Sequence, residues 1–347
     1  MLLEGLYLPL TTPFYPDGRL NLRKIEHNVD RYSRTPAAGM VVLSDVGEPA
    51  MLSDDETHEA LTAAISLAAE TKVMIAGISR ASVFSTLKLA EFAATAGYDA
   101  VLVKRPGNIS EGKGYELQTF FQAVADSSPL PLVLYSAPDA ALSVETISAL
   151  ASHPQIIGLV DEDSSSDRVE QIRAATSVVS RDVTVTAVFA AMTGRMLAVK
   201  ESVGTATFVS AETLGGGSAV ATAPPKPAIK TRSKKVGFQI ITASSAGMLE
   251  GLRAGAAGVM PAFAACAPQA SYEVYAAWKD DDQPLADEKQ IRLDAAIKTA
   301  EVELGLAGIR YACDVNGYFG GRPRLPILPL SGDARERVEQ VMKGIRN

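Results

Sequence analysis

Short, almost continuous apolar runs recur along most of the chain and are separated by longer stretches with helical periodicity. Runs without alternation between apolar and polar residues are typical of parallel strands that are buried on both faces. Because eight such runs alternate with helical segments, the pattern predicts a (β/α)8 TIM barrel. The predicted strands occupy residues 5–10, 39–44, 72–79, 99–104, 131–137, 155–160, 237–242 and 257–263.

The segments between the runs carry the usual signals of helix ends. The helix predicted after the second strand opens with Ser53, and Glu56 completes a capping box with it. The helix after the third strand ends at Gly97, a common helix stop. A doubly wound sheet is the main alternative fold. The sequence has no G-x-G-x-x-G motif after the first strand, and this favours the barrel.

The alternation of strands and helices stops after the eighth strand. From residue 268 onward the pattern is helical, which predicts a barrel domain at 1–267 and a C-terminal helical domain at 268–347. About sixty residues separate the helix at 167–176 from the seventh strand, where a barrel needs only a short connection. We therefore predict an insertion at about 180–236, between strands 6 and 7, that packs on the barrel or on a neighbouring subunit.

The composition narrows the classes of function. The net charge of −7 leaves no basic surplus for phosphates, which argues against a nucleic-acid partner. No apolar run reaches the roughly 18 residues that span a bilayer, and the first residues lack the basic start and cleavage site of a signal peptide. Cys266 and Cys313 are too few for a disulfide framework. We therefore expect a cytoplasmic protein without a membrane partner.

Four segments, taken in order, carry a resemblance to a known family. They are "LPLTTPFYPDGRLN" at 8–21, "GMVVLSDVGEPAMLSDDE" at 39–56, "PLVLYSAP" at 131–138 and "AGIRYACDVNGYFGGRPRLPILPLS" at 307–331. The chain resembles the dihydrodipicolinate synthase / N-acetylneuraminate lyase family, and its ending "GYFGGRPRLP" is similar to the branch that includes 4-hydroxy-2-oxoglutarate aldolase. The resemblance covers nearly the whole chain except the insertion.

The resemblance implies a lyase or aldolase that forms a homodimer or homotetramer. In this family a lysine forms a Schiff base with pyruvate or a related small 2-oxo acid, and no metal or organic cofactor is needed. The lysine amine must be neutral to attack a carbonyl, so it lies desolvated at the C-terminal mouth of the barrel. A tyrosine hydroxyl relays protons beside it, and a G-T-T-G-E loop binds the substrate carboxylate.

The catalytic pair of the family is only half present. The tyrosine is Tyr135, but the lysine position falls on Val160, and no lysine occurs between Lys113 and Lys200. Lys104 ends the fourth strand, so it could replace the missing lysine at the mouth, where all strand ends converge. The alternative is a solvated or ion-paired lysine. Lys200 lies in the insertion, where a solvated helix face is expected.

The loop that binds the substrate carboxylate also departs from the family pattern. Asp45 and Val46 replace its two threonines, although Gly47 and Glu48 remain. Asp45 would repel a 2-oxo acid carboxylate unless it were protonated or paired. The arginine that many members carry after the tyrosine is absent, and Ala140 stands near its place. The predicted substrate-binding residues are Asp45, Val46, Gly47, Glu48, Arg105, Val160 and Met260.

An acidic cluster after the sixth strand suggests a metal site as another possibility. Several carboxylates at one mouth could bind Mg²⁺ or Ca²⁺, and a metal could polarise a 2-oxo acid without a lysine. The alternative is a helix start, because Ser164 and Asp167 have capping-box spacing. The carboxylates concerned are those of Asp45, Glu48, Asp161, Glu162 and Asp163.

The sequence thus supports a family lyase that acts on or binds a small 2-oxo acid, with its Schiff-base chemistry lost or relocated. Tyr135 and Lys104 are the candidate catalytic residues. A non-catalytic relative that binds a ligand or serves as a scaffold is the first alternative, and a metal-assisted lyase is the second. Fold alone does not decide between them, because this barrel hosts many functions.

Overall fold

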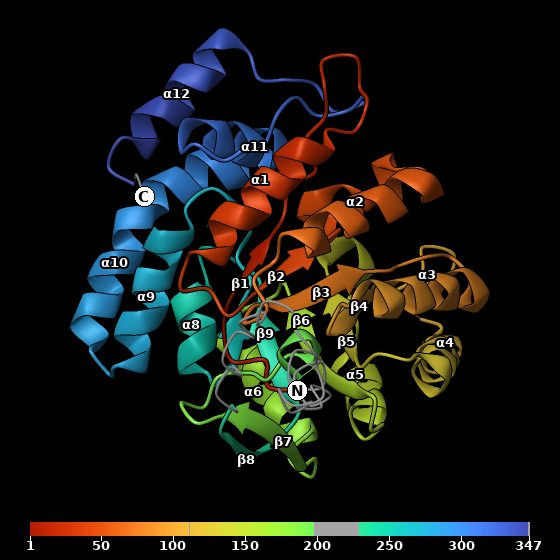
Figure 1. Cartoon of the computed structure of the whole chain (residues 1–347). Helices are drawn as coiled ribbons and strands as arrows, with labels where there is room; N and C mark the ends of the chain where they lie inside the picture. The colour runs from red at the N-terminus through yellow and green to blue at the C-terminus, as the bar shows by residue number, and fades with distance from the viewer. Residues whose placement is uncertain (111, 198–228, 346–347) are drawn as a thin grey trace, which may run out of the picture.

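The computed structural model describes residues 1–110, 112–197 and 229–345. Eight parallel strands close into a barrel in the order β1-β10-β9-β6-β5-β4-β3-β2 (Figure 1). Pairing of β1 with β10 closes the ring, so the predicted TIM barrel is confirmed and the doubly wound sheet is wrong. The strands are β1 (Gly5–Pro9), β2 (Gly39–Val42), β3 (Val73–Gly77), β4 (Ala100–Lys104), β5 (Leu132–Ser136), β6 (Ile156–Asp161), β9 (Gln239–Thr242) and β10 (Gly258–Val259).

The barrel strands are buried on both faces, which explains their continuous apolar sequences. One face fills the barrel interior, where Tyr7, Val41 and Val160 belong to one apolar cluster. The other face packs against the surrounding helices, and Leu8 and Leu134 belong to the larger cluster formed there. Because neither face meets solvent, polar residues appear mainly at the strand ends, where the barrel opens.

Helices follow the strands and surround the barrel (Figure 1). Both hydrogen bonds of the predicted capping box are present between Ser53 and Glu56, and Gly97 ends α3 with a positive φ of 97°. No helix in the described part of the chain is long and apolar enough to cross a membrane. The helices are α1 (Leu22–Ser33), α2 (Asp54–Ser66), α3 (Val83–Ala96), α4 (Gly114–Ser127), α5 (Val144–Ala151), α6 (Ser166–Ala175) and α8 (Met248–Arg253).

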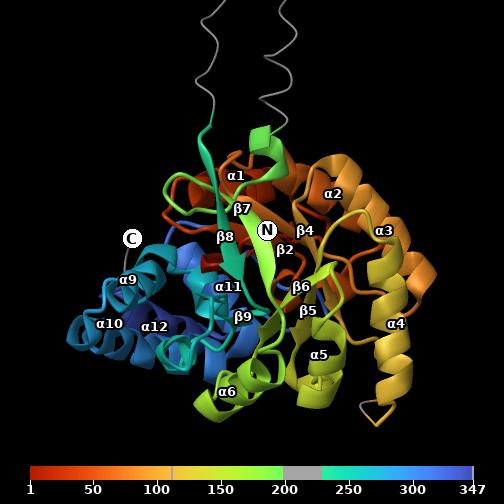
Figure 2. The same ribbon diagram turned by 90° about the horizontal axis from the view of Figure 1, so that it is seen from below.

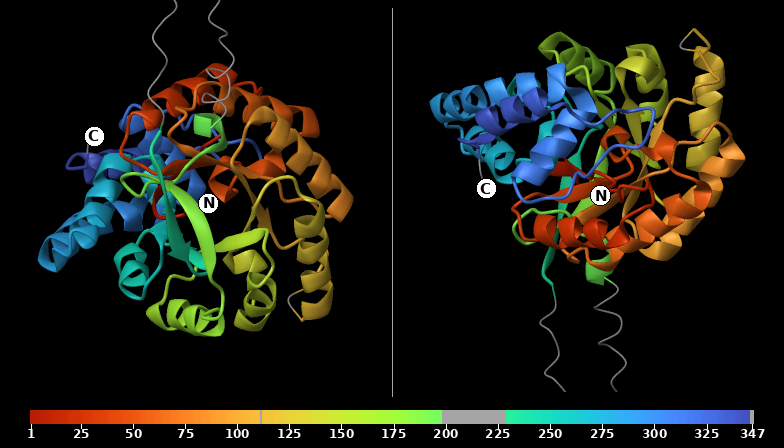
Figure 3. Two further views of the ribbon diagram at one scale, coloured as in Figure 1. Left: turned by 60° about the horizontal axis from the view of Figure 1, so that its bottom comes forward. Right: turned by 90° about the horizontal axis from the view of Figure 1, so that it is seen from above.

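The chain after β10 is helical and gathers on one side of the barrel, next to α1 (Figure 3). The rings of Tyr32 on α1 and Tyr318 stack with centroids 4.6 Å apart, and Asn28 Nδ2 donates a 2.9 Å hydrogen bond to the carbonyl of Phe319. The C-terminal segment is therefore fixed to the barrel wall. Its elements are α9 (Pro268–Lys279), α10 (Gln283–Ala296), the π-helical turn η6 (Ile297–Glu303), α11 (Gly305–Val315) and α12 (Gly332–Met342).

The described ends of the predicted insertion form an antiparallel hairpin of β7 (Arg181–Thr186) and β8 (Thr231–Val236). The hairpin lies across the end of the barrel where the chain begins (Figure 2). Val183 and Val185 pack there with Leu2. This end is opposite the strand ends that carry the candidate site. The middle of the insertion and Lys200 lie outside the described residues, and the predicted domain boundary at 267/268 stays a prediction.

Candidate functional site

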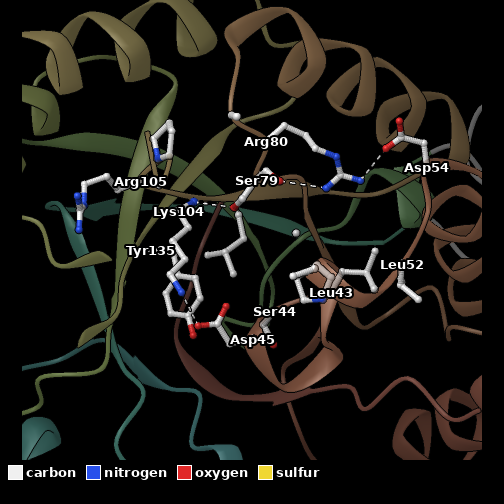
Figure 4. A pocket seen from close by; sticks show the side chains of 17 residues that line it. Leu43, Ser44, Asp45, Leu52, Asp54, Ser79, Arg80, Lys104, Arg105 and Tyr135 are labelled. Carbon is white, nitrogen blue, oxygen red and sulfur yellow. Dashed lines mark hydrogen bonds and ion pairs between the residues drawn. The ribbon is translucent and has the colours of Figure 1, made fainter. Parts of the chain in front are cut away.

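The carboxyl ends of β2 to β5 surround a cavity of about 430 Å³ at the barrel mouth (Figure 4). Lys104 is the last residue of β4 and pairs in register with Tyr135 of β5, because adjacent parallel strands end at the same level. Both side chains line the cavity. The polar and charged residues that matter below are Ser44, Asp45, Arg80, Lys104, Arg105 and Tyr135.

The amine of Lys104 points into the mouth and is held by two carboxylates. Its Nζ lies 2.7 Å from Asp45 Oδ2 and 2.7 Å from Asp139 Oδ1, and 5.6 Å from the centroid of the Tyr135 ring. Burial lowers the pKa of Lys104, but the hydrogen bonds and charges of Asp139 and Asp45 outweigh burial and raise it. Lys104 is therefore an ammonium ion at neutral pH, and it must lose a proton before it can attack a carbonyl.

Tyr135 lies beside the amine of Lys104 and forms a hydrogen bond with a half-buried carboxylate. Its hydroxyl donates a hydrogen bond to Glu162 Oε1. Burial raises the pKa of Tyr135 strongly, and the charges of Asp45 and Glu162 raise it further, so the phenol stays protonated. Burial also raises the pKa of Glu162, with a further rise from Asp45 that the Tyr135 hydrogen bond and Lys104 oppose. The pair is thus arranged to hold a proton beside Lys104.

A second cavity of about 210 Å³ adjoins the first and shares Ser44 and Tyr135 with it. Glu162 lines this cavity from the end of β6, and Glu301 reaches it from η6. Burial raises the pKa of Glu301 to about 7, against hydrogen bonds from Ser245 and the Phe263 backbone that lower it. The charge of Glu162 adds to the rise. Two carboxyl groups with raised pKa values therefore face one small space.

The mouth brings some predicted substrate-binding residues together. Asp45 and Arg105 line the first cavity, and Val46 and Met260 line the second. Arg105 is partly committed to the fold, because its guanidinium donates to the carbonyl of Ile109 at 2.6 Å. These residues are contributed by β2, β4 and β10 or the loops that follow them, as expected for a barrel mouth.

The remaining predicted residues line neither cavity. Gly47 accepts a 2.6 Å hydrogen bond from Thr12 Oγ1 through its carbonyl. Glu48 turns away from the mouth and forms a fully buried ion pair with Arg310 of α11. Val160 is fully buried in the barrel interior, in register with Tyr135. Gly47 and Glu48 therefore join the loop after β2 to neighbouring elements.

The acidic residues at the end of β6 divide between two partners. Arg168 Nε lies 2.7 Å from Asp161 Oδ2 and 3.9 Å from Asp163 Oδ2, whereas Glu162 accepts a hydrogen bond from Tyr135. Among the residues that the structure describes, no group of three or more His, Cys, Asp or Glu side chains is arranged to hold a metal ion. The donor set of the predicted Mg²⁺ or Ca²⁺ site is therefore not assembled there.

The predicted capping box at this helix start is wrong. The N-cap of α6 is Ser165, without a side-chain cap bond. The hydroxyl of Ser164 instead accepts a 3.1 Å hydrogen bond from the backbone N–H of Ser244. Asp163 Oδ1 accepts from the backbone N–H of Ser165 at 3.2 Å, so a turn, and not a capping box, leads into α6.

Comparison with known proteins identifies the family. A sequence profile of the Dihydrodipicolinate synthetase family matches residues 2–212 and 227–345. The chain belongs to this family. The predicted resemblance is therefore confirmed, and the matched residues include both cavities of the mouth.

The relatives of this family member include synthases. The chain is 36% identical over 180 residues to a 4-hydroxy-tetrahydrodipicolinate synthase of Xanthomonas campestris pv. campestris, a match that spans 51% of this chain and 59% of that protein. A synthase of the same name from Exiguobacterium sp. is 26% identical over 98% of this chain and 97% of its own length. A dihydrodipicolinic acid synthase family protein from E. coli K12, solved in complex with pyruvate, shares the fold with a TM-score of 0.76 at 19% identity, over 99% of each chain.

The sequence analysis did not assign several residues of the site, among them Ser44, Arg80, Asp139 and Glu301. Arg80 follows β3, Asp139 lies in the short turn η3 (Pro138–Ala140), and Glu301 lies in η6. The position of Arg80 just after a strand was a usable signal, since strand ends converge at the mouth. Asp139 and Glu301 had none, because a turn and a polar helix pattern look alike whether or not they face a cavity.

Proposed function

We propose that this family member is a carbon–carbon lyase that acts on a small 2-oxo acid, with Lys104 as the amine and Tyr135 as the proton relay. The observation that carries the proposal is the approach of Lys104 Nζ to the Tyr135 ring, at 5.6 Å from its centroid, inside one cavity. In related barrels the chemistry occurs at this end of the strands. Val160, in register with Tyr135, leaves the usual lysine position apolar.

Schiff-base formation requires that Lys104 first give up a proton. Asp45 and Asp139 both contact the ammonium and are the available acceptors. The neutral amine then adds to the C2 carbonyl of the 2-oxo acid, and the carbonyl oxygen leaves as water after it gains two protons. Tyr135 and Glu162 can supply and recover a proton during this exchange, because they share a hydrogen bond beside the amine.

A non-catalytic binding protein is the second candidate, and the state of Lys104 favours it. The two carboxylates that raise the pKa of Lys104 also stabilise its charged form, which is not nucleophilic. In this candidate the ammonium and Arg80 bind a 2-oxo acid or related carboxylate without reaction. A metal-assisted lyase has no comparable support, since Arg168 pairs with Asp161 and Asp163 while Glu162 accepts from Tyr135.

Trapping with pyruvate and borohydride separates the two candidates. The expected result is an intact-mass adduct that maps to Lys104 in the wild-type protein and is lost in Lys104→Gln. Lys113→Gln is the matched control, because Lys113 is exposed and pairs only with Glu116 among the described residues. A wild-type protein that gives no adduct at high pyruvate refutes the lyase mechanism and leaves the binding candidate.

The cytoplasmic location expected from the composition stays a prediction. The homodimer or homotetramer implied by the family resemblance also stays a prediction. Light scattering coupled to gel filtration tests the assembly directly. A monomer at micromolar concentration would contradict the predicted homo-oligomer.

A further inference from the structure

The small cavity beside the mouth has an acidic lining, and one of its two acids, Glu301, has no role in the proposed chemistry. Its charged side chains are Glu162 and Glu301, and no lysine or arginine is among the described residues that line it. Ser44 and Tyr135 connect it to the larger cavity. At about 210 Å³ it is smaller than the roughly 300–1,000 Å³ of pockets for drug-sized ligands, so it suits a group of a few atoms.

Two residues that line this cavity each carry a buried acceptor atom without a partner among the described residues. Ser44 is only 2% exposed, and its hydroxyl oxygen is buried without a hydrogen-bond partner among the described residues. The hydroxyl does not cap the turn η1 (Asp45–Gly47) that Ser44 precedes. Oε2 of Glu301 is also buried without a partner in the described part of the chain. Buried polar atoms are normally hydrogen-bonded, so these two atoms indicate a missing donor.

The electrostatics of the cavity favour a positive charge. Burial raises the pKa values of both Glu162 and Glu301, and the charge of Glu162 adds to the rise at Glu301. The groups that act on Glu301 include the hydroxyl of Ser245 and the backbone of Phe263, and Glu301 in turn raises the pKa of Cys266. None of these groups that act on Glu301 is a cation, whereas Lys104 opposes the rise at Glu162. A carboxylate ligand would be repelled, whereas a cation would restore the ionised form of both acids.

We propose that this cavity binds the primary ammonium group of a small amine, between Ser44, Glu162 and Glu301. An ammonium group has three N–H donors and no acceptor, which matches a lining of one unpartnered hydroxyl and two carboxylates. An alcohol has one donor and no charge, so it leaves at least one acceptor unsatisfied. The site does not depend on Schiff-base chemistry at Lys104, and a ligand can fill it whether or not the protein is a lyase.

Calorimetric titration with n-propylammonium chloride tests the site, with n-propanol and sodium chloride as the neutral and ionic controls. The wild-type protein should bind n-propylammonium at least about tenfold more tightly than n-propanol. Glu301→Gln should lower the affinity for the amine by about tenfold or more, because the substitution removes a charged acceptor. Glu303→Gln is the matched control. Glu303 lies on the same turn but pairs with Arg337 at the surface, so the variant should bind n-propylammonium as tightly as the wild type does.

Two further measurements keep the test decisive. Titration at pH 7 in buffers of different ionisation enthalpy should show net proton release on binding, since Glu301 has a pKa of about 7 before the amine binds. Ser44→Ala should lower the affinity for the amine by a few fold. The substitution should not affect folding, because the hydroxyl makes no hydrogen bond among the described residues. This variant decides the question if Glu301→Gln fails to fold.

The results that overturn the proposal are distinct from those that refute the lyase. Equal affinity for n-propanol would show a hydroxyl site, and unchanged affinity in both variants would place the amine elsewhere. Absence of saturable binding would also refute the ammonium site. The pyruvate adduct at Lys104 is measured separately, so either proposal can fail while the other stands.

Discussion

The raised pKa of Glu301 should make the protein less stable as the pH rises, and one substitution should abolish this dependence on pH. Its pKa rises from 4.5 to about 7 in the folded protein, chiefly through burial. Between these two pH values the folded chain keeps a proton that the unfolded chain releases. The free energy of unfolding therefore falls as the pH rises through this window.

The size of this loss follows from the pKa difference. At about 1.4 kcal/mol for each unit of pKa, a rise from 4.5 to about 7 corresponds to about 3 kcal/mol at pH 8. Glu301→Gln cannot ionise and has nearly the shape of the protonated acid. The variant should therefore match the wild type near pH 4.5 and exceed it by up to about 3 kcal/mol at pH 8.

Thermal or urea unfolding at pH 4.5 and pH 8, followed by circular dichroism, measures this difference. Glu303→Gln is the control, since its partner Arg337 lies at the surface, and its small effect should be similar at both pH values. If Glu301→Gln shifts stability equally at pH 4.5 and pH 8, Glu301 does not titrate in this window. A loss of stability at pH 8 would refute the reasoning outright, because it would mean that the ionised carboxylate stabilises the fold.

Three other substitutions test separate parts of the structure. Arg310→Met leaves Glu48 buried without its partner, so thermal melting should show a loss of about 3–5 kcal/mol; a neutral effect would mean that the pair is not buried. Tyr135→Phe removes the donor to Glu162 and should slow formation of the pyruvate adduct by about 100-fold, measured by quenched trapping. Val160→Lys adds an amine to the barrel interior. It should destabilise the protein more at pH 5 than at pH 9, because burial opposes the charged amine, and borohydride should trap pyruvate at that position.

The barrel was predictable because each strand carries its signal locally. Residues 155–160 read as a buried strand, and β6 is Ile156–Asp161. The hairpin of β7 and β8 was not predictable. The sequence of β8, "TRSKKV", is polar and mostly exposed, so no apolar periodicity marks it. Its partner lies far away in the sequence, and only the folded chain shows the pairing.

Part of the mouth was predictable for a similar reason. Lys104 and Tyr135 lie at the ends of neighbouring strands, so their proximity follows from parallel topology. Glu48 was predicted to bind substrate at the mouth, but its side chain does not reach it. The cause is long-range, because its partner Arg310 comes from α11 and draws the side chain away from the mouth. Glu301 could not be assigned either, since the packing of η6 against the barrel, and not its sequence, brings it to the second cavity.

The two cavities differ in charge, and this difference bears on how a ligand with two ends would lie. Three cations line the first cavity, against the two carboxylates of Asp45 and Asp54. The charged residues of the second are both acids. If both proposals hold, a carboxylate lies in the first cavity and an ammonium in the second, with Tyr135 on the wall that they share. A molecule that carries both groups would then span this tyrosine, which places its central carbons beside the hydroxyl that can move a proton. The cations of the first cavity are those of Arg80, Lys104 and Arg105.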